Sequence, residues 1–220
     1  MKTRQTYDLI VFDWDGTLMD SAAAIVASLQ GACRDLDLPV PRDEDARYII
    51  GLGLNDALSH ILPGLDTVQY PRVVERYRHH FLALDAGTAL FAGIEEIVVG
   101  LHGAGYQLAI ATGKSRRGLT RALATTGLAA YFHASRCADE GHTKPHPGML
   151  QTIMRELGAA PDKTLMIGDT THDLAMARAA GVAAVGVAYG AHTHDILSTC
   201  SPLACIASVA ELRDWLAANG

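Results

Sequence analysis

The chain alternates short apolar runs with longer segments in which apolar residues recur every three or four positions. The apolar run at residues 7–12 predicts a buried strand, and Gly16 then lets the chain turn away from the end of that strand. Residues 21–87 show helical periodicity and no strand pattern. Their apolar stripes fall at Ile25, Leu29, Ala32, Cys33 and Leu36, and again at Val74, Tyr77, Phe81 and Leu84.

From residue 94 onward, strand-like and helix-like segments alternate. Expected strands cover residues 107–111, 135–137, 165–167 and 183–187, and expected helices cover 94–102, 115–126, 148–157, 171–180 and 208–218. Ser208 and Glu211 have the spacing of a capping box. The alternation predicts right-handed crossovers and a doubly wound parallel α/β sheet, with helices on both faces.

The order of these segments predicts two domains. Residues 1–19 and 88–220 form the α/β core, and residues 20–87 form a helical cap inserted after the first strand. Residues 18–21, Gly87 and Gly93 are candidate hinges. A cap at this point of the chain lies over the carboxyl ends of the strands, where such sheets bind ligands.

Composition and charge exclude several classes of function. The 18 basic and 24 acidic residues give a net charge of −6 with no basic run, which argues against nucleic-acid binding. Residues 1–5 lead into the first strand without a signal-peptide core, and no run of 18 apolar residues follows, so a soluble cytoplasmic protein is expected. Cys33, Cys137, Cys200 and Cys205 lack C-x-x-C spacing, which predicts reduced, mostly buried thiols.

Polar side chains follow four of the predicted strands at the points where the strands end. They are Asp13 and Asp15, then Thr112 with Gly113, then Lys144, and finally Asp169 with Asp173. Taken singly, each has a structural reading as a turn, a solvated loop lysine or a helix cap. Taken together they suit phosphoryl transfer, because hydrolysis of a phosphate monoester needs a nucleophile, a proton donor and groups that neutralise the phosphoryl charge.

Each residue type matches one task in that reaction. Asp13 would attack phosphorus, and Asp15 would protonate the leaving oxygen and then deprotonate water. Thr112 and the backbone at Gly113 would bind phosphoryl oxygens, and Lys144 would add a positive charge. The carboxylates of Asp13 and Asp169 and the backbone carbonyl of Asp15 would hold Mg²⁺, with Asp173 a ligand through water or a brace.

These stretches resemble the haloacid dehalogenase (HAD) superfamily. The motifs are Asp13-Trp14-Asp15-Gly16-Thr17-Leu18 with Asp20-Ser21, then Thr112-Gly113-Lys114, Lys144-Pro145-His146-Pro147-Gly148-Met149 and Gly168-Asp169-Thr170-Thr171-His172-Asp173. The resemblance spans almost the whole chain. It implies a Rossmann-like core, an inserted helical cap, Mg²⁺ dependence and the residue roles above. The cap position and the Lys-Pro-x-Pro-Gly-Met stretch are most similar to the phosphoglycolate phosphatase branch.

The sequence also departs from that branch. Gly113 stands where Asn often follows the motif threonine, and Ala92 stands where Pro is common. Residues 50–54 resemble the substrate-facing loop of the cap, whereas Arg47 and Asn55 are weaker candidates for specificity, for which a surface role is the stronger interpretation. His172, beside the metal-ligand pair, is expected at a solvated helix start, with contact to the substrate as its alternative.

Three other functions use similar residues. A phosphomutase of the β-phosphoglucomutase type would share the aspartate pair and differ only in how its cap excludes water. A dehalogenase needs the nucleophile but not an acid, so Asp15 argues against it, and a receiver-like phospho-acceptor domain would be shorter and would lack a cap. The expected partner is a small phosphorylated metabolite, such as phosphoglycolate or a sugar phosphate, bound by a monomer or a homodimer.

Overall fold

A computed structural model describes residues 6–85 and 87–220 of the chain. The core is one parallel sheet of six strands in the order β3-β2-β1-β4-β5-β6. The strands are β1 (Leu9–Phe12), β2 (Gln107–Thr112), β3 (Ala134–Cys137), β4 (Thr164–Gly168), β5 (Ala183–Val187) and β6 (Cys205–Ile206). This confirms the doubly wound α/β prediction and puts the first strand between β2 and β4.

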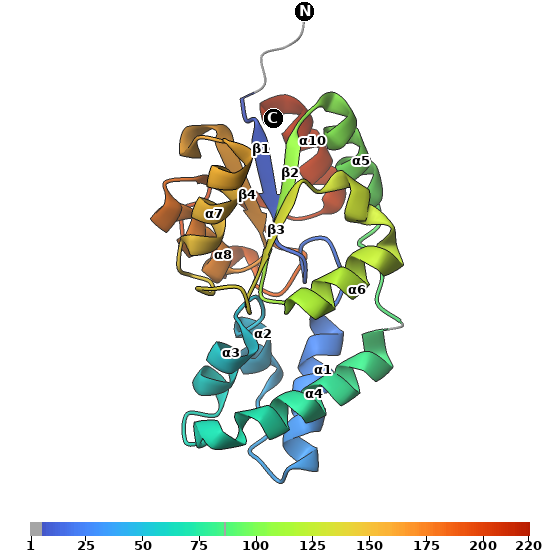
Figure 1. The fold of residues 1–220 in the computed structure, drawn as a ribbon, viewed down its shortest axis with the longest axis vertical. Helices are drawn as coiled ribbons and strands as arrows, with labels where there is room; N and C mark the ends of the chain where they lie inside the picture. The colour runs from blue at the N-terminus through green and yellow to red at the C-terminus, as the bar shows by residue number, and fades with distance from the viewer. Residues whose placement is uncertain (1–5, 86) are drawn as a thin grey trace, which may run out of the picture.

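Helices cover both faces of this sheet (Figure 1). They are α5 (Ile94–Ala104), α6 (Arg116–Thr126), α7 (Gly148–Leu157), α8 (Thr171–Ala180), α9 (His194–Ser198) and α10 (Val209–Asn219). Successive side chains of a strand point to opposite faces, so Leu9 and Val11 pack with α7 and α8. Ile10 and Phe12 pack with α5, α6 and α10 on the other face. The continuous apolar run of β1 is therefore buried on both sides, as expected for the centre of a parallel sheet.

The inserted segment forms a helical cap with its own apolar core. Its helices are α1 (Ala22–Asp35), α2 (Asp43–Tyr48), α3 (Leu54–Ile61) and α4 (Tyr70–Asp85). The predicted stripe residues Ile25 and Leu29 of α1 and Phe81 of α4 are buried in that core. Figure 1 shows the cap beyond the carboxyl ends of the strands, where it covers the end of the sheet that carries the polar residues.

The structure contains two elements that the sequence pattern did not predict, and it corrects the capping box expected at the last helix. The strand β6 and the helix α9 are too short to produce a periodic signal, and the sequence pattern did not predict them. Ser208 caps α10 by accepting the Glu211 N–H, but the Glu211 carboxylate accepts from Ala207 N–H and not from Ser208, so the capping box is half formed.

The structure also bears on the expectations for the cysteines and for membrane-spanning segments. All four cysteines are free thiols, with Cys33 and Cys137 buried and Cys200 and Cys205 half-buried. Across the described residues, no helix has the length and apolar character needed to cross a bilayer. Residues 1–5, expected to lead into the first strand, lie outside the described residues, as does Ala86 beside the hinge candidate Gly87.

Ile10 tests how far stability depends on the central strand. Its side chain is fully buried, so Ile10→Ala should lower the free energy of unfolding by about 2–5 kcal/mol through lost burial and a cavity. Val68 is 82% exposed, and Val68→Ala should change stability by no more than about 0.5 kcal/mol. Urea denaturation of both variants measures this, and equal stabilities would contradict the placement of β1.

Candidate active site

Strand β1 delivers Asp13 to the centre of the sheet's carboxyl edge. The backbone N–H of Asp13 still donates to Ile167 O of β4 at 2.9 Å, so the sheet ladder fixes its position. Its side chain is fully buried, and the neighbouring Trp14 packs into the main apolar core. The nucleophile candidate is therefore held on rigid backbone.

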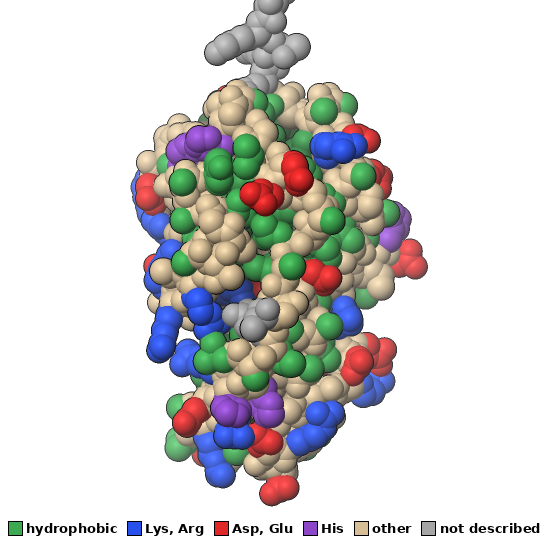
Figure 2. Space-filling model, turned by 90° about the vertical axis from the view of Figure 1, so that its right-hand side faces the viewer, with side chains coloured by type: hydrophobic (Ala, Val, Ile, Leu, Met, Phe, Trp, Pro, Cys, Tyr) green, Lys and Arg blue, Asp and Glu red, His purple; other side chains and the backbone are tan. Residues whose placement is uncertain are grey.

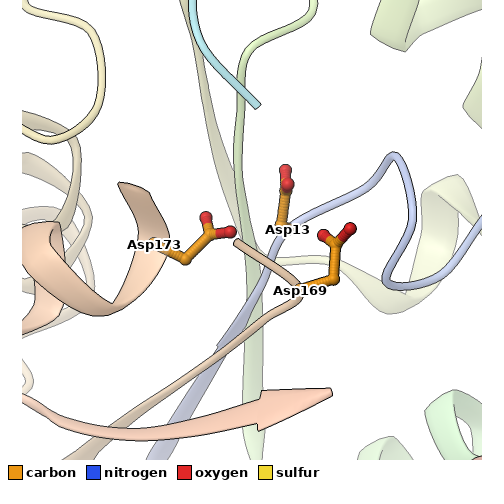
Figure 3. A group of neighbouring side chains, drawn as sticks. All are labelled: Asp13, Asp169 and Asp173. Carbon is orange, nitrogen blue, oxygen red and sulfur yellow. The ribbon is translucent and has the colours of Figure 1, made fainter. Parts of the chain in front are cut away.

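Three fully buried carboxylates meet at this point. One oxygen from each of Asp13, Asp169 and Asp173 lies within 4.8 Å of the other two (Figure 3). Asp13 follows β1, Asp169 follows β4 and Asp173 lies on the first turn of α8. The side chain of Asp15 is not in this group, so any contribution of Asp15 to a metal site would come from its backbone carbonyl.

The ammonium group of Lys144 lies between two of these carboxylates. Lys144 Nζ is 2.8 Å from Asp13 Oδ1 and 2.6 Å from Asp173 Oδ1, and all three side chains are inaccessible to solvent. Burial alone lowers the pKa of Lys144, but the two carboxylates outweigh burial and raise that pKa above its usual value. Lys144 is thus no solvated loop lysine, but a permanent positive charge inside the site.

Hydrogen bonds fix the other two carboxylates. Asp169 accepts from Thr17 Oγ1 at 2.9 Å and from the Ala191 N–H at 2.7 Å. Asp173 accepts from the backbone N–H and the hydroxyl of Thr170 at 3.1 and 2.7 Å, which completes a capping box at the start of α8. The cap role and the site role considered for Asp173 are therefore compatible, because its second oxygen faces Lys144.

The charges of this cluster do not balance. Three carboxylates face one ammonium group, and burial together with the charge of Asp173 raises the pKa of Asp169 to about 7. Burial likewise raises the pKa of Asp13 well above its ordinary value, although Lys144 opposes the shift. Asp13 Oδ2 is buried without a hydrogen-bond partner among the described residues. Free carboxylate oxygen and excess negative charge suit a hard divalent cation such as Mg²⁺.

Asp15 lies in a separate environment beside the cluster. Its Oδ1 accepts from Ser21 Oγ at 2.6 Å and is 3.0 Å from Lys114 Nζ. Lys114 Nζ in turn lies 4.7 Å from the centre of the Phe81 ring in the cap, a cation–π contact. Ser21 and Lys114 had no assigned role in the sequence interpretation, although both belong to stretches that resemble family motifs.

A cavity of about 570 Å³ opens between the cap and the core next to Asp15. Its core side includes Asp15, Gly113 and Lys114, and its cap side includes apolar side chains of α1 and α4. The weaker specificity candidate Asn55 lines this cavity, whereas Arg47 does not. The buried carboxylates of Asp13, Asp169 and Asp173 lie deeper and are not among its lining residues.

Comparison with known proteins agrees with this geometry. A family model described as haloacid dehalogenase-like hydrolase matches residues 10–187. The chain belongs to this family. The probable phosphatase IndB of Dickeya dadantii is 38% identical over 209 residues, which cover 93% of this chain and 91% of IndB. The phosphoglycolate phosphatase of Salmonella typhimurium is 28% identical over 216 residues, which cover 88% of this chain and 86% of that protein.

A solved structure supports the same assignment. The crystal structure of a predicted phosphatase from Clostridium acetobutylicum matches 97% of this chain and 100% of its own, with a TM-score of 0.86 and 25% sequence identity. The family resemblance inferred from the motifs is therefore confirmed, as is the prediction that this HAD-like hydrolase is an enzyme of the phosphatase type.

The structure explains why this HAD-like hydrolase has glycine at position 113. Thr112 is fully buried, and its Oγ1 accepts from the Lys114 N–H at 3.2 Å. A Cβ added at Gly113 would lie 2.5 Å from Gly51 O and 2.6 Å from Leu52 O of the cap. The Asn common in relatives would not fit against this cap loop, so glycine is required by close contact between cap and core.

A second contact between cap and core of the HAD-like hydrolase lies at the end of α2, just before this loop. The carbonyl of Tyr48 lies 2.8 Å from His172 Nε2 and 3.1 Å from His192 Nε2. His192 Nδ1 accepts from the Thr171 N–H at 3.1 Å, so its proton belongs on Nε2 and this imidazole is neutral. Burial lowers the pKa of both histidines, which agrees with this state. His172 is thus packed against the cap and is not a solvated helix start.

Gly113→Ala should push the cap loop away from the core of this HAD-like hydrolase. Because the new Cβ would overlap two backbone carbonyls, we expect kcat/KM to fall by about tenfold or more and residues 49–53 to exchange amide hydrogens faster. Gly103 in α5 has open space around its Cα, so Gly103→Ala is the matched control. Unchanged exchange in Gly113→Ala would show that the loop does not depend on this contact.

Proposed function

We propose that the protein is a Mg²⁺-dependent phosphatase that hydrolyses a small phosphorylated metabolite through an aspartyl-phosphate intermediate. The observation that carries this proposal is the difference in hydrogen bonding between the two oxygens of the Asp13 carboxylate. Its Oδ1 accepts from the Trp14 N–H at 2.7 Å and pairs with Lys144, while its Oδ2 is buried without a hydrogen-bond partner in the described residues. One oxygen is held in place and the other is free to attack.

In the first step, Asp13 Oδ2 attacks phosphorus and the bond from phosphorus to the ester oxygen breaks. Asp15 gives its proton to that departing oxygen, so the alcohol leaves neutral. In the second step, Asp15 removes a proton from water, and the resulting hydroxide attacks the aspartyl phosphate. Inorganic phosphate leaves and both aspartates return to their starting states. The cavity position of Asp15 supports this role, because substrate and water reach it from the same side.

The remaining residues hold and neutralise the phosphoryl group. Lys144 faces the Asp13 carboxylate, and its charge opposes the negative charge that develops on the phosphoryl oxygens. The loop after β2 provides the Thr112 hydroxyl and backbone N–H groups, and Gly113 lines the cavity. Asp173 pairs with Lys144, which supports the brace role for it over that of a metal ligand through water.

Asp13 and Asp169, with the Asp15 carbonyl, would hold the Mg²⁺ ion, and Asp173 would orient the cluster. When bound, the ion would offset the repulsion between the carboxylates and the phosphate and stabilise the phosphoryl charge. The fit rests on the three-carboxylate cluster and on the raised pKa values of Asp13 and Asp169.

Phosphoglycolate is a substrate that the name of one relative supports, and sugar phosphates are the second class expected from the sequence. The phosphoglycolate phosphatase of Salmonella typhimurium acts on the first by its name, and this chain shares 28% identity with it. The mutase alternative keeps the same aspartates and differs in whether water or a sugar hydroxyl takes the phosphoryl group. Release of inorganic phosphate from a panel of phosphate esters supports the phosphatase, whereas interconversion of isomers without release supports the mutase.

Asp13→Asn and Asp15→Asn should fail in different ways. Loss of the nucleophile should lower kcat for p-nitrophenyl phosphate by at least about 10³-fold, with no burst of nitrophenol. Asp15→Asn should still form the aspartyl phosphate, since nitrophenolate leaves without a proton donor, but should hydrolyse it slowly. Rapid-quench kinetics should then show a burst of one nitrophenol per enzyme. Full turnover by Asp13→Asn would refute the covalent mechanism.

Metal removal should abolish activity without unfolding the core. After dialysis against EDTA, we expect turnover to fall by at least about 10²-fold and to return when Mg²⁺ is added, because the paired carboxylates then regain a counter-charge. Circular dichroism monitors the fold, and Asp169→Asn should lose activity that Mg²⁺ does not restore. Equal rates before and after dialysis, with metal content verified, would remove Mg²⁺ from the mechanism.

A further inference from the structure

The cavity between cap and core is larger than a two-carbon acid requires. Its volume of about 570 Å³ lies in the range of pockets that enclose drug-sized ligands. One wall is apolar and comes from the cap helices α1 and α4, with the partly exposed ring of Tyr77 and the buried ring of Phe81 among the lining side chains. A substrate that fills this cavity therefore has an apolar or aromatic body beyond its phosphate.

Arginine side chains line the same cavity from both domains. Arg78 comes from α4 of the cap, and Arg117 and Arg121 come one turn apart on α6 of the core. Figure 2 shows lysine and arginine side chains gathered on one side of the molecule at the height where the cap meets the core. The cavity thus has cationic groups in addition to those assigned to the reacting phosphate.

Arg78 and Arg117 are exposed side chains, and their pairing differs from that of two neighbouring arginines that do not line the cavity. Arg76 pairs with Asp35, and Arg116 donates two hydrogen bonds to Glu140, at 2.9 and 2.7 Å. In contrast, Arg78 and Arg117 have no hydrogen-bond or ion-pair partner within residues 6–85 and 87–220. Arg76 and Arg116, which do not line the cavity, are each neutralised by a carboxylate of the protein, whereas Arg78 and Arg117, which line it, are not.

The carboxylates of the cavity do not supply the missing counter-charge. Asp15 pairs with Lys114. Asp56 accepts from the Thr143 hydroxyl and Asp139 from the Arg116 backbone N–H at 2.8 Å, and within the described residues neither forms an ion pair with Arg78 or Arg117. Two arginines without a partner on opposite walls of one cavity are typical of a site that binds an anion supplied by the ligand.

We propose that Arg78 and Arg117 bind a second anionic group, a carboxylate or a phosphate, at the end of the substrate far from the hydrolysed phosphate. This inference rests on the proposed function and narrows its substrate class. The preferred phosphate monoester carries a negative charge at each end of an apolar body. Cap and core each supply one arginine, so the charged tail also links the two domains when substrate is bound.

A set of matched aryl phosphates tests this proposal. The series is phenyl phosphate with a para substituent that is neutral (hydroxymethyl), a carboxylate (carboxymethyl), a phosphate analogue that cannot be hydrolysed (phosphonomethyl) or cationic (aminomethyl). The wild-type enzyme with Mg²⁺ should have a kcat/KM at least about tenfold higher for an anionic tail than for the neutral one, the value expected for a charge-assisted contact. The carboxylate and phosphonate arms identify which anion is preferred.

Variants assign the preference to the two arginines. Arg78→Ala and Arg117→Ala should each reduce the anionic-to-neutral ratio of kcat/KM by about tenfold, and Arg117→Glu should favour the cationic tail. Arg72 is exposed on α4 outside the cavity, so Arg72→Ala is the matched control and should leave the ratio unchanged.

Hydrolysis of the neutral ester with no preference for an anionic tail would overturn the second anion site while leaving the phosphatase proposal intact. A preference that survives in both alanine variants would also overturn it. If Mg²⁺-loaded enzyme hydrolyses none of the esters, the proposed function itself fails and this inference fails with it.

Discussion

The buried contact of Lys144 with Asp13 and Asp173 is the interaction on which the rest of the site depends. Its partners come from the end of the first strand, the loop after the third strand and the first turn of α8. A buried charge is costly unless it is paired, so none of these three residues can be displaced without leaving another charge uncompensated. The contact therefore requires the correct strand order before it can form, and it fixes three motifs in one place.

This contact also leaves the site short of positive charge. The single ammonium group of Lys144 does not neutralise three carboxylates, and the raised pKa values of Asp13 and Asp169 report that imbalance. A structure built only for stability would replace such a cluster with apolar side chains. Its position at the carboxyl edge of a parallel sheet, beneath a cap, instead fits the proposed binding of a phosphoryl group together with a counter-ion.

The sequence predicted the residues that follow strands better than those that lie on helices. Asp13, Asp15, Thr112, Lys144 and Asp169 come at the ends of recognisable strands, and parallel strands bring those ends together. The strand β6 produced no signal because it has two residues. Arg78 and Arg117 could not be predicted as cavity residues, because an arginine on an amphipathic helix has the same pattern whether it faces solvent or another domain. The sequence showed Gly113 as a departure from the family pattern. The reason for the glycine is its contact with a loop of the cap, which the sequence alone does not reveal.

Asp15 shows how the two parts of the molecule depend on one another. The other acidic residues of the site are buried in the core, whereas Asp15 lines the cavity and is held by Ser21 and Lys114. Ser21 is the N-cap position of the first cap helix, and Lys114 contacts Phe81 in the cap. The proposed acid/base is therefore positioned by groups that depend on the placement of the cap. In the proposed mechanism, a substrate body bound between Phe81 and α6 would lie next to Lys114, the residue that pairs with Asp15, and would thereby link recognition of the substrate body to proton transfer at its phosphate.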